Sequence, residues 1–309
     1  MSEDYYVVLA GGVGAAKFLD GLRRVVDPAK LKIIVNTGDD IHLFGLYICP
    51  DLDIITYTMA DLVDKEKGWG FENESFNCLS ILKQYYGFEW FNAGDKDLAT
   101  HIFRTDLFHQ GLTKAEITQK ICQKLSIKAE LIPMCNASVE TFIRISEGYI
   151  HFEEFYIKHQ CEPEILGVRF KNIDPAIPMT GPLEYIKPAK KVIICPSNPI
   201  VSIGTILQVK GIRKTLADIK EKVYAISPII QGATVKGPAD NLMEAEGYEA
   251  TSLGVAQFYR DILGTFIIDQ KDAPLKSQIE ALGVQVHAFD TLMTTIQKKM
   301  ALADFILNL

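Results

Sequence analysis

The sequence has few of the features that mark membrane, secreted or nucleic-acid-binding proteins. No apolar run approaches the roughly 18–20 residues that a membrane-spanning helix requires. The first residues are acidic and lead into an apolar segment, without the basic start and small-residue cleavage site of a secretory signal. The net charge is -7, whereas nucleic-acid-binding proteins usually present a basic surface. We therefore expect a cytoplasmic protein with no nucleic-acid or membrane partner.

Several catalytic and metal-binding signatures are also missing. The six cysteines form no CxxC pair, and the six histidines show no HExxH or other metal-ligand spacing, so the common zinc and iron–sulfur sites are absent. No GxSxG sequence is present, which argues against the nucleophile elbow of α/β-hydrolases. Several cysteines lie in apolar patterns and are predicted to be reduced core thiols, as in cytoplasmic proteins.

Apolar residues, by contrast, are abundant and arranged in short runs. They make up 48% of the 309 residues, which is enough for a large buried core. Residues 5–10 and 31–36 are continuous apolar runs, typical of buried parallel strands, and a helix is predicted over 15–25. This order is a βαβ unit. Further strands of the same kind are predicted over 190–196, 222–230, 265–270 and 284–289, with a terminal helix over 290–307.

The middle of the chain has a different pattern. We predict a single α/β domain with a Rossmann-like, mostly parallel sheet flanked by helices, and with an inserted helical and antiparallel β elaboration. The core spans approximately 1–60 and 185–309, and the insertion, approximately 61–184, covers the substrate site. The inserted elements are predicted as helices over 75–86, 97–110 and 113–125, and as strands over 141–146, 149–157 and 165–170.

The first predicted strand runs into a glycine-rich loop with Gly11, Gly12 and Gly14. Glycines let the backbone approach a ligand closely, and the N-terminus of the following helix favours phosphate. Lys17 lies in the first turn of that helix and would add a positive charge. The loop is neither a Walker A sequence nor a complete GxGxxG, because Lys17 stands at the third glycine position. We expect anion binding here, and the alternative is a tight turn without a ligand.

A second loop, Thr37-Gly38-Asp39-Asp40, follows the second predicted strand. Two adjacent acids after a buried strand are costly unless they are solvated or bind a cation. Mg²⁺ is commonly held by one or two carboxylates together with substrate phosphates. Asp39 and Asp40 are therefore the candidate metal ligands. The alternative is that one of them caps a following helix.

Two further segments place acids near aromatic residues or proline. Asp51 and Asp53 follow Pro50, where spacing alone favours a turn and a helix cap, although Asp53 would also suit binding or activation of a hydroxyl. Residues 90–97 combine aromatic residues with Asn92, Gly94 and Lys96. Aromatic residues beside a glycine turn suit a flat-ring site. Composition alone favours a turn that caps the next helix.

The later strands also end in loops suited to ligand binding. Ser197, Asn198 and Pro199 present hydroxyl, amide and backbone donors on a restricted backbone, which suits a ribose or a phosphate, and the alternative is a rigid turn. Lys236 lies in another such loop and is a candidate phosphate ligand, although isolated loop lysines are usually solvated. Because the carboxyl ends of parallel strands share one edge of a sheet, we expect these loops to meet there.

Together these segments resemble the 2-phospho-L-lactate transferase (CofD) family of coenzyme F-420 biosynthesis. The resemblance covers nearly the whole chain, and the combination of segments is specific although no single loop is. Gly68-Trp69-Gly70 and the TYT segment help to separate it from YvcK-like regulatory proteins. The matching segments, in order, are VVLAGGVGAAKFLDGL, IVNTGDD, CPDLDIITYTMADLVDKEKGWG, GDKDLATHIFRT, CPSNPIVSIGTIL and VKGPADNLMEAEGYEATSLGVAQFYRDI.

The resemblance implies a reaction and its participants. The donor is lactyl-2-diphospho-5′-guanosine and the acceptor is FO, 7,8-didemethyl-8-hydroxy-5-deazariboflavin. The ribityl hydroxyl of FO attacks the phosphorus that bears the lactyl group, GMP leaves, and Mg²⁺ is the cofactor. A homodimer is expected.

The resemblance also assigns roles to residues. Asp53, Asn92 and Lys96 are expected at the FO site, and Asn92 stands where relatives can carry arginine. The Gly11–Gly14, Thr37–Asp40 and Ser197–Pro199 loops are expected around the nucleotide and its diphosphate.

Two other function classes remain open from the sequence. A YvcK-like regulator would bind a nucleotide sugar without catalysis. An NAD(P)-dependent dehydrogenase fits less well, because GxGxxG is incomplete and the second predicted strand ends in Asn36 rather than in an acid.

Overall fold

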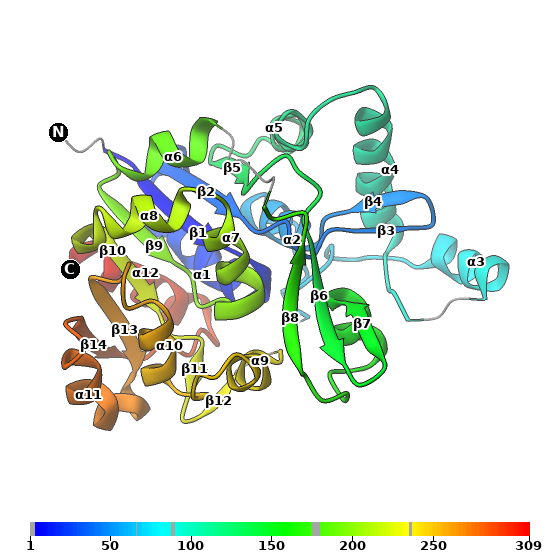
Figure 1. Cartoon of the computed structure of the whole chain (residues 1–309). Helices are drawn as coiled ribbons and strands as arrows, with labels where there is room; N and C mark the ends of the chain where they lie inside the picture. Colours follow the sequence, from blue (N-terminus) through cyan, green and yellow to red (C-terminus); the bar gives the residue numbers. More distant parts are fainter. Residues whose placement is uncertain (1–3, 66, 88–89, 175–179, 235–236) are drawn as a thin grey trace.

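A seven-stranded sheet, in which every pairing is parallel, forms the centre of the protein (Figure 1). The computed structural model describes all residues except 1–3, 66, 88–89, 175–179 and 235–236. Most of its strands are buried on both faces, which explains their continuous apolar runs. Across the sheet the strands are β14 (Gln285–Phe289), β13 (Thr265–Asp269), β10 (Val223–Ile226), β9 (Lys191–Ile194), β1 (Tyr6–Ala10), β2 (Leu31–Val35) and β5 (Glu130–Pro133).

The direction of strand order changes between β1 and β9. From β1 the chain adds β2 and β5 on one side, whereas from β9 it adds β10, β13 and β14 on the other. The chain segments that leave β1 and β9 therefore diverge. In a parallel sheet such a point opens a crevice at the carboxyl ends of the strands, where ligands bind.

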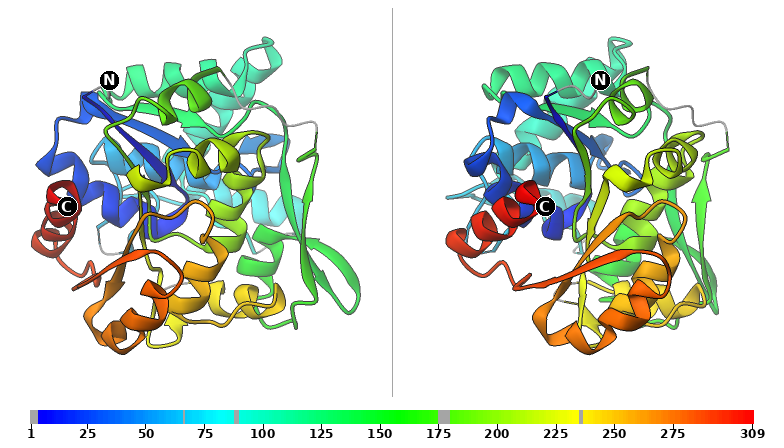
Figure 2. Two further views of the ribbon diagram at one scale, coloured as in Figure 1. Left: turned by 60° about the vertical axis from the view of Figure 1, so that its left-hand side comes forward. Right: turned by 90° about the vertical axis from the view of Figure 1, so that its left-hand side faces the viewer.

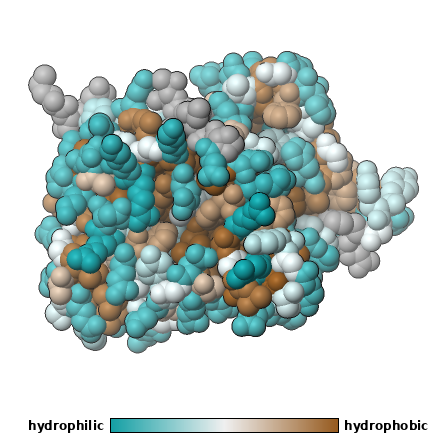
Figure 3. Space-filling view, in the orientation of Figure 1, coloured by the Kyte–Doolittle hydropathy of each residue, from teal (hydrophilic) through white to brown (hydrophobic). Residues whose placement is uncertain are grey.

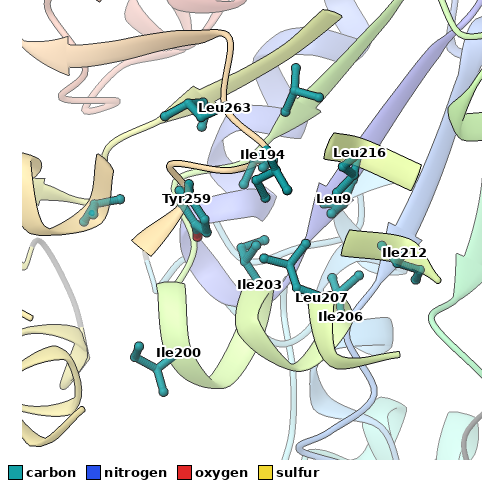
Figure 4. Close-up of a cluster of buried hydrophobic side chains, with 14 of the residues drawn as sticks. Leu9, Ile194, Ile200, Ile203, Ile206, Leu207, Ile212, Leu216, Tyr259 and Leu263 are labelled. Carbon is teal, nitrogen blue, oxygen red and sulfur yellow. The ribbon is translucent and has the colours of Figure 1, made fainter. Parts of the chain in front are cut away.

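Helices cover both faces of the sheet, and Figure 2 shows the layers from two further sides. Successive side chains of β1 point to opposite faces, so Leu9 packs in one core and Val8 in the other. Figure 4 shows part of the first core, where Leu9 and Ile194 meet side chains from α7 and α8. The Val8 face is covered by α1 (Gly12–Val25), α2 (Pro50–Met59), α5 (Lys114–Lys124) and α12 (Ile296–Asn308); the Leu9 face by α6 (Thr180–Ile186), α7 (Thr205–Gln208), α8 (Ile212–Ala217), α9 (Ala239–Ala245), α10 (Ser252–Phe258) and α11 (Lys276–Glu280).

Smaller elements extend from the sheet on the side of β2 and β5 and near its carboxyl edge (Figure 1). On the face shown in Figure 3, hydrophilic side chains predominate and hydrophobic ones gather near the centre. The smaller elements are the antiparallel hairpin β3 (Ile41–Leu43) and β4 (Leu46–Ile48), the helices α3 (Asn77–Tyr86) and α4 (Asp95–His109), the antiparallel sheet β7 (Gly148–His151), β6 (Glu140–Ile145) and β8 (Gly167–Lys171), and the short pair β11 (Ile229–Ile230) and β12 (Ala233–Thr234).

The predicted fold class is confirmed, and the differences are local. The strand predicted over 149–157 ends at His151, because the chain enters a π-helical turn at Glu154–Lys158 that buries Phe155. The terminal helix begins only at Ile296, after an irregular segment. β5 was not predicted, and it joins the main sheet although it lies within the range expected for the insertion.

From the sequence we expected no membrane-spanning helix, and we expected the cysteines to be reduced. Among the described residues, none of the helices has the length and apolarity needed to cross a membrane. All six cysteines are free, and four of them are buried.

Candidate active site

A large cavity, of about 550 Å³, lies at the carboxyl edge of the sheet where β1 and β9 diverge. Its centre is formed by the glycine-rich loop and by residues 196–198. One end reaches α2, α4 and the segment around Trp69, and the other reaches the loops that follow β10 and β14. Loops far apart in the sequence therefore meet around one space, as expected from the parallel strands. The cavity is large enough for a drug-sized ligand.

The glycine-rich loop and the loop after β9 are in direct contact. A side chain at Gly14 would place its Cβ 2.1 Å from the carbonyl oxygen of Pro196, so only glycine permits this approach. The backbone N–H of Gly11 donates to Ser197 Oγ over 3.3 Å. The two loops thus form one floor for the cavity.

The start of α1 provides an anion-binding element at this floor. Gly11 is the N-cap residue and contributes no capping side chain, and the backbone of Gly12 instead donates to the carboxylate of Asp51. Lys17 lies one to two turns into the same helix and lines the cavity. Asn198 lines the opposite side, and its Oδ1 accepts from the N–H groups of Ile200 and Val201, which caps the next helical turn. The glycine-lined start of α1, the helix dipole and a lysine together suit a phosphate group here.

Asn36, at the end of β2, holds two carboxylates side by side at the cavity floor. Its Nδ2 donates to Asp39 Oδ2 over 3.1 Å and to Asp51 Oδ2 over 2.9 Å. Burial and the negative charge of Asp51 raise the pKa of Asp39 well above its usual range. Burial likewise raises the pKa of Asp51 to about 7, although Asn36 and the Gly12 backbone oppose this rise. Two close buried carboxylates of this kind favour a bound cation.

A third acid faces the same floor. Glu153 follows β7 and lines the cavity, and burial together with the charges of Asp51 and Asp40 raises its pKa to about 8. Sequence reasoning missed Glu153 because residues 149–157 were expected to form one strand. No local signal marked it, since only the folding of the β6–β7 hairpin over the main sheet brings it to the cavity.

Asp39 and Asp40 have different surroundings, although both were predicted as metal ligands and catalytic residues. Asp39 lines the cavity, and its Oδ1 has no hydrogen-bond partner among the described residues. Asp40 points away from the cavity into a buried ion pair, in which its Oδ2 accepts from Lys114 Nζ and from the Tyr47 hydroxyl, each over 2.6 Å. The interpretation of Asp40 as a cavity ligand is therefore corrected: a buried lysine already neutralises it. The partner of Asp39 is Asp51.

Three other predicted residues lie beneath the cavity rather than in its lining. Thr37 is fully buried. The carbonyl of Gly38 accepts from the N–H of Thr141 in β6 over 2.6 Å. Gly38 also packs against α7, since an added Cβ would lie 2.6 Å from the Thr205 side chain. Pro199 is buried at the start of the helical turn that precedes α7. These residues support the floor and do not contact a ligand directly.

Asp53 lies at the α2 end of the cavity in a buried cluster. Arg104 donates to both of its oxygens, one of the contacts being 3.1 Å, and His101 Nε2 lies 3.2 Å from Asp53 Oδ2. Burial opposes ionisation of Asp53, yet Arg104 and His101 together lower its pKa below the usual value. Asp53 is therefore ionised, and it does not cap α2 as its spacing suggested. His101 lines the cavity beside it, and its Nδ1 has no partner among the described residues.

Of the three predicted residues that remain, one lines the cavity, one lies away from it and one is outside the described residues. Asn92 lines the cavity and is exposed, and its Oδ1 accepts from Lys83 over 3.3 Å. Lys96 does not reach the cavity, because its ammonium group donates to the carbonyls of Glu72 and Asn73 at 2.7 and 2.8 Å. It borders a separate shallow groove beside α4, so its assignment to the acceptor site is not supported by its position. Lys236 lies outside the described residues.

A sequence profile described as 2-phospho-L-lactate transferase CofD matches residues 6–305. The chain belongs to the CofD family. The 2-phospho-L-lactate transferase of Methanosarcina mazei is 38% identical over 302 residues, which cover 98% of this chain and 99% of the relative. A phosphoenolpyruvate transferase of Streptomyces griseus is 39% identical over 309 residues, covering 98% of this chain and 97% of the relative.

The CofD fold is also found among solved structures. A crystal structure of a UPF0052 family member from Bacillus halodurans superimposes with a TM-score of 0.63 and covers 99% of both chains. Its sequence is only 16% identical, so the comparison concerns the fold alone. The named transferases among the relatives differ in the group that they transfer, and the cavity is where such a difference would be expressed.

Proposed function

We propose that this CofD protein transfers a 2-phospho-L-lactyl group from lactyl-2-diphospho-5′-guanosine to the ribityl hydroxyl of FO and releases GMP. The observation that supports this most strongly is the position of the cavity. It joins the N-terminus of α1, which suits a diphosphate, to the Asp53 cluster, which suits a hydroxyl. A donor and an acceptor can therefore meet inside one space.

The diphosphate of the donor would bind at the floor made by the two loops. The first amides of α1 and the ammonium group of Lys17 would donate to its non-bridging oxygens, opposite Asn198. The guanosine would then extend toward the β10 and β14 loops, where Ser227 and Thr291 line the cavity. Fixed donors of this kind stabilise charge that develops in the transition state.

The residues at the floor fit Mg²⁺. Asp39 and Asp51 would hold it, since one oxygen of Asp39 is buried with no hydrogen-bond partner in the described part of the chain and the two carboxylates are adjacent. When bound, the ion would neutralise charge on the diphosphate oxygens. Among the described residues, no group of three or more histidine, cysteine, aspartate or glutamate side chains is arranged to hold a metal, so substrate oxygens would complete the coordination.

Asp53 would orient the acceptor. Arg104 and His101 fix its carboxylate, and a carboxylate has lone pairs enough to accept one more hydrogen bond. Its lowered pKa makes it a hydrogen-bond acceptor for the hydroxyl rather than a group that keeps the proton. The hydroxyl oxygen forms a bond to the phosphorus that carries the lactyl group, the bond from that phosphorus to the GMP oxygen breaks, and the hydroxyl proton leaves to solvent. Phosphoryl transfer of this type depends mainly on positioning and charge neutralisation.

A direct assay tests the proposal. Purified protein with FO, the lactyl donor and Mg²⁺ should release GMP and form phospholactyl-FO in equal amounts, and a parallel reaction with the enolpyruvyl analogue measures donor selectivity. Absence of a deazaflavin product with either donor would refute the transferase. Binding of a nucleotide sugar without FO turnover would support a YvcK-like regulator instead.

Replacing Asp53 tests the acceptor end of the site. Asp53→Asn should raise the KM for FO and lower kcat/KM by on the order of a hundredfold, because one fixed acceptor is lost and Arg104 keeps an unpaired charge. GDP affinity, measured by calorimetry, should stay within twofold of the wild type. Unchanged kinetics would remove Asp53 from the site.

A further inference from the structure

We propose that Trp69 is the stacking platform for the flat tricyclic ring of the acceptor, and so determines acceptor affinity. This inference rests on the proposed function, since it takes FO as the acceptor.

The loop is a closed turn that follows α2. Val63 pairs with Phe71 across its base, and the N–H of Asp64 donates to the carbonyl of Gly70 over 3.0 Å. The N–H of Gly68 donates back to the carbonyl of Asp64 over 2.8 Å. Phe71 also packs on Tyr57 of α2, with ring centroids 4.0 Å apart. The loop is therefore held against the wall of the cavity.

The two glycines that flank Trp69 fix the backbone direction at the tip. Gly68 and Gly70 have φ values of +74° and +68°, which residues with side chains rarely adopt. Space does not require glycine at either position, because an added Cβ would come no closer than 3.8 Å to a neighbouring atom. Glycine is favoured at both positions by the positive φ of the backbone. This backbone conformation places Trp69, the residue between the two glycines, in the cavity lining.

The indole ring of Trp69 has no aromatic partner among the residues that the structure describes. Trp69 is 37% exposed, and among the described residues no other aromatic ring contacts it. The other tryptophan, Trp90, packs edge-on against Phe91 with centroids 5.8 Å apart. An indole left open at the mouth of a binding cavity gains most from a flat ring that covers it.

The position of the loop favours the acceptor ring over guanine. The backbone of Gly70 approaches Asp97 of α4, since a Cβ there would lie 3.9 Å from its carboxylate. At Gly68 an added Cβ would lie 3.8 Å from Val13 and 3.9 Å from Lys17, so the loop reaches from the α1 floor to α4. Trp69 therefore lies between the diphosphate floor and the α2–α4 end, where Tyr57 and Phe91 supply apolar walls and Asp53 would orient the hydroxyl. The nucleoside would extend from the α1 floor to the opposite end of the cavity.

The experiment uses equilibrium binding and the absorbance of FO in the full-length protein. Trp69→Ala should raise the Kd for FO on the order of tenfold, as expected for loss of one ring-on-indole stack, and Trp69→Phe should restore most of the affinity. The absorbance shift of FO on binding should be present in the wild type and in Trp69→Phe, and absent in Trp69→Ala. The Kd for GDP should not change in either variant. Tyr85→Ala, at an exposed aromatic of α3 that is not in the cavity lining, is the matched control and should behave as the wild type.

The outcomes separate this inference from the proposed function. If the wild type binds and converts FO but Trp69→Ala binds it equally well, stacking on Trp69 is wrong and the transferase stands. If Trp69→Ala weakens GDP instead of FO, the ring on Trp69 is guanine and the inference is again overturned. A wild type that neither binds nor converts FO would overturn both. Trp69→Ala and Tyr85→Ala should both unfold at the wild-type temperature, so that a change in FO affinity reports the lost indole and not a lost fold.

Discussion

Asp39 and Asp40 are adjacent in sequence but differ in what neutralises them. Asp40 shares a buried ion pair with Lys114, whereas Asp39 faces the cavity beside Asp51 and forms no ion pair with any residue that the structure describes. One carboxylate therefore belongs to the framework and the other to the site.

Single substitutions at these two positions should have opposite effects. Asp40→Asn leaves the Lys114 ammonium buried without its counter-charge and should lower the free energy of unfolding by about 3–5 kcal/mol. Asp39→Asn removes a repulsion, so stability should be unchanged or higher, while kcat/KM for GMP release falls by on the order of a hundredfold. Urea unfolding and the transfer assay measure the two effects. A stable but inactive Asp40→Asn protein would contradict this division.

The sequence allowed the loops of the site to be predicted, but only some of their side chains. The glycine-rich loop, Asp39, Asp53, Asn92 and Asn198 all line the cavity. The glycine-rich loop, Asp39 and Asn198 do so because they follow parallel strands that end at the same edge of the sheet. Glu153 and His101 line it too, but their chain neighbours carry no signal for that position. The contacts that distinguish Asp39 from Asp40 are long-range: Lys114 is 74 residues away.

At the scale of elements, the contact between the β1–α1 loop and the loop after β9 positions the anion site. Gly14→Ala would place its Cβ 2.1 Å from the Pro196 carbonyl oxygen, so the two backbones must separate. We expect a lower Tm and at least a tenfold weaker affinity for GDP, measured by calorimetry. Gly45→Ala is the control: nothing lies within 4 Å of its Cβ, so it should cost only backbone strain and leave GDP affinity unchanged. Equal GDP affinity in the two variants would argue against a phosphate at this floor.

The contact between α1 and α12 should make the free energy of unfolding depend on pH. Asp20 of α1 accepts from Lys299 of α12 over 2.9 Å and from Arg23 and Arg24 of its own helix. Burial opposes its ionisation, but these cations lower its pKa below the usual value. A lowered pKa in the folded state stabilises the protein above the unfolded-state pKa of about 3.9, and the effect is lost as the pH falls through the folded-state value.

Asp20→Asn should therefore destabilise the protein by about 1–2 kcal/mol at pH 7. The difference from the wild type should shrink as the pH falls below about 4, because the wild-type carboxylate is then protonated. Asp304→Asn, at an exposed position of α12, serves as the control and should have no such effect. A difference that is independent of pH would show that the charge of Asp20 is not what stabilises the contact.

The parallel strands could be predicted from the sequence because buried strands read as continuous apolar runs. The short hairpin of β3 and β4, the strand β5 and helix α2 were not predicted. β5 has only four residues, one of them proline, and it becomes a strand because β2 offers it an open edge. α2 has buried residues all round, including Asp51 and Asp53, so its pattern has no clear amphipathic period.

At the scale of the whole molecule, the change of direction between β1 and β9 opens the cavity between two sides of the sheet, which would let it hold the two proposed substrates. The β2 side of the sheet contributes α2, α4 and the Trp69 loop, and the β10 side contributes the loops after β10 and β14. The acids and the α1 N-terminus lie between them. A donor held from one side and an acceptor held from the other would react at the centre. The homodimer implied by the family resemblance stays a prediction, which light scattering in solution would test.

The central claim is that donor and acceptor meet at the α1 floor of this single cavity. A crystal structure of the protein with GDP, FO and Mg²⁺ tests it most directly. We predict the diphosphate between Gly12 and Asn198, the ribityl hydroxyl of FO at Asp53 and directed toward the terminal phosphate, and the ring against Trp69. A diphosphate bound away from the N-terminus of α1, or an FO molecule outside the cavity, would contradict the account.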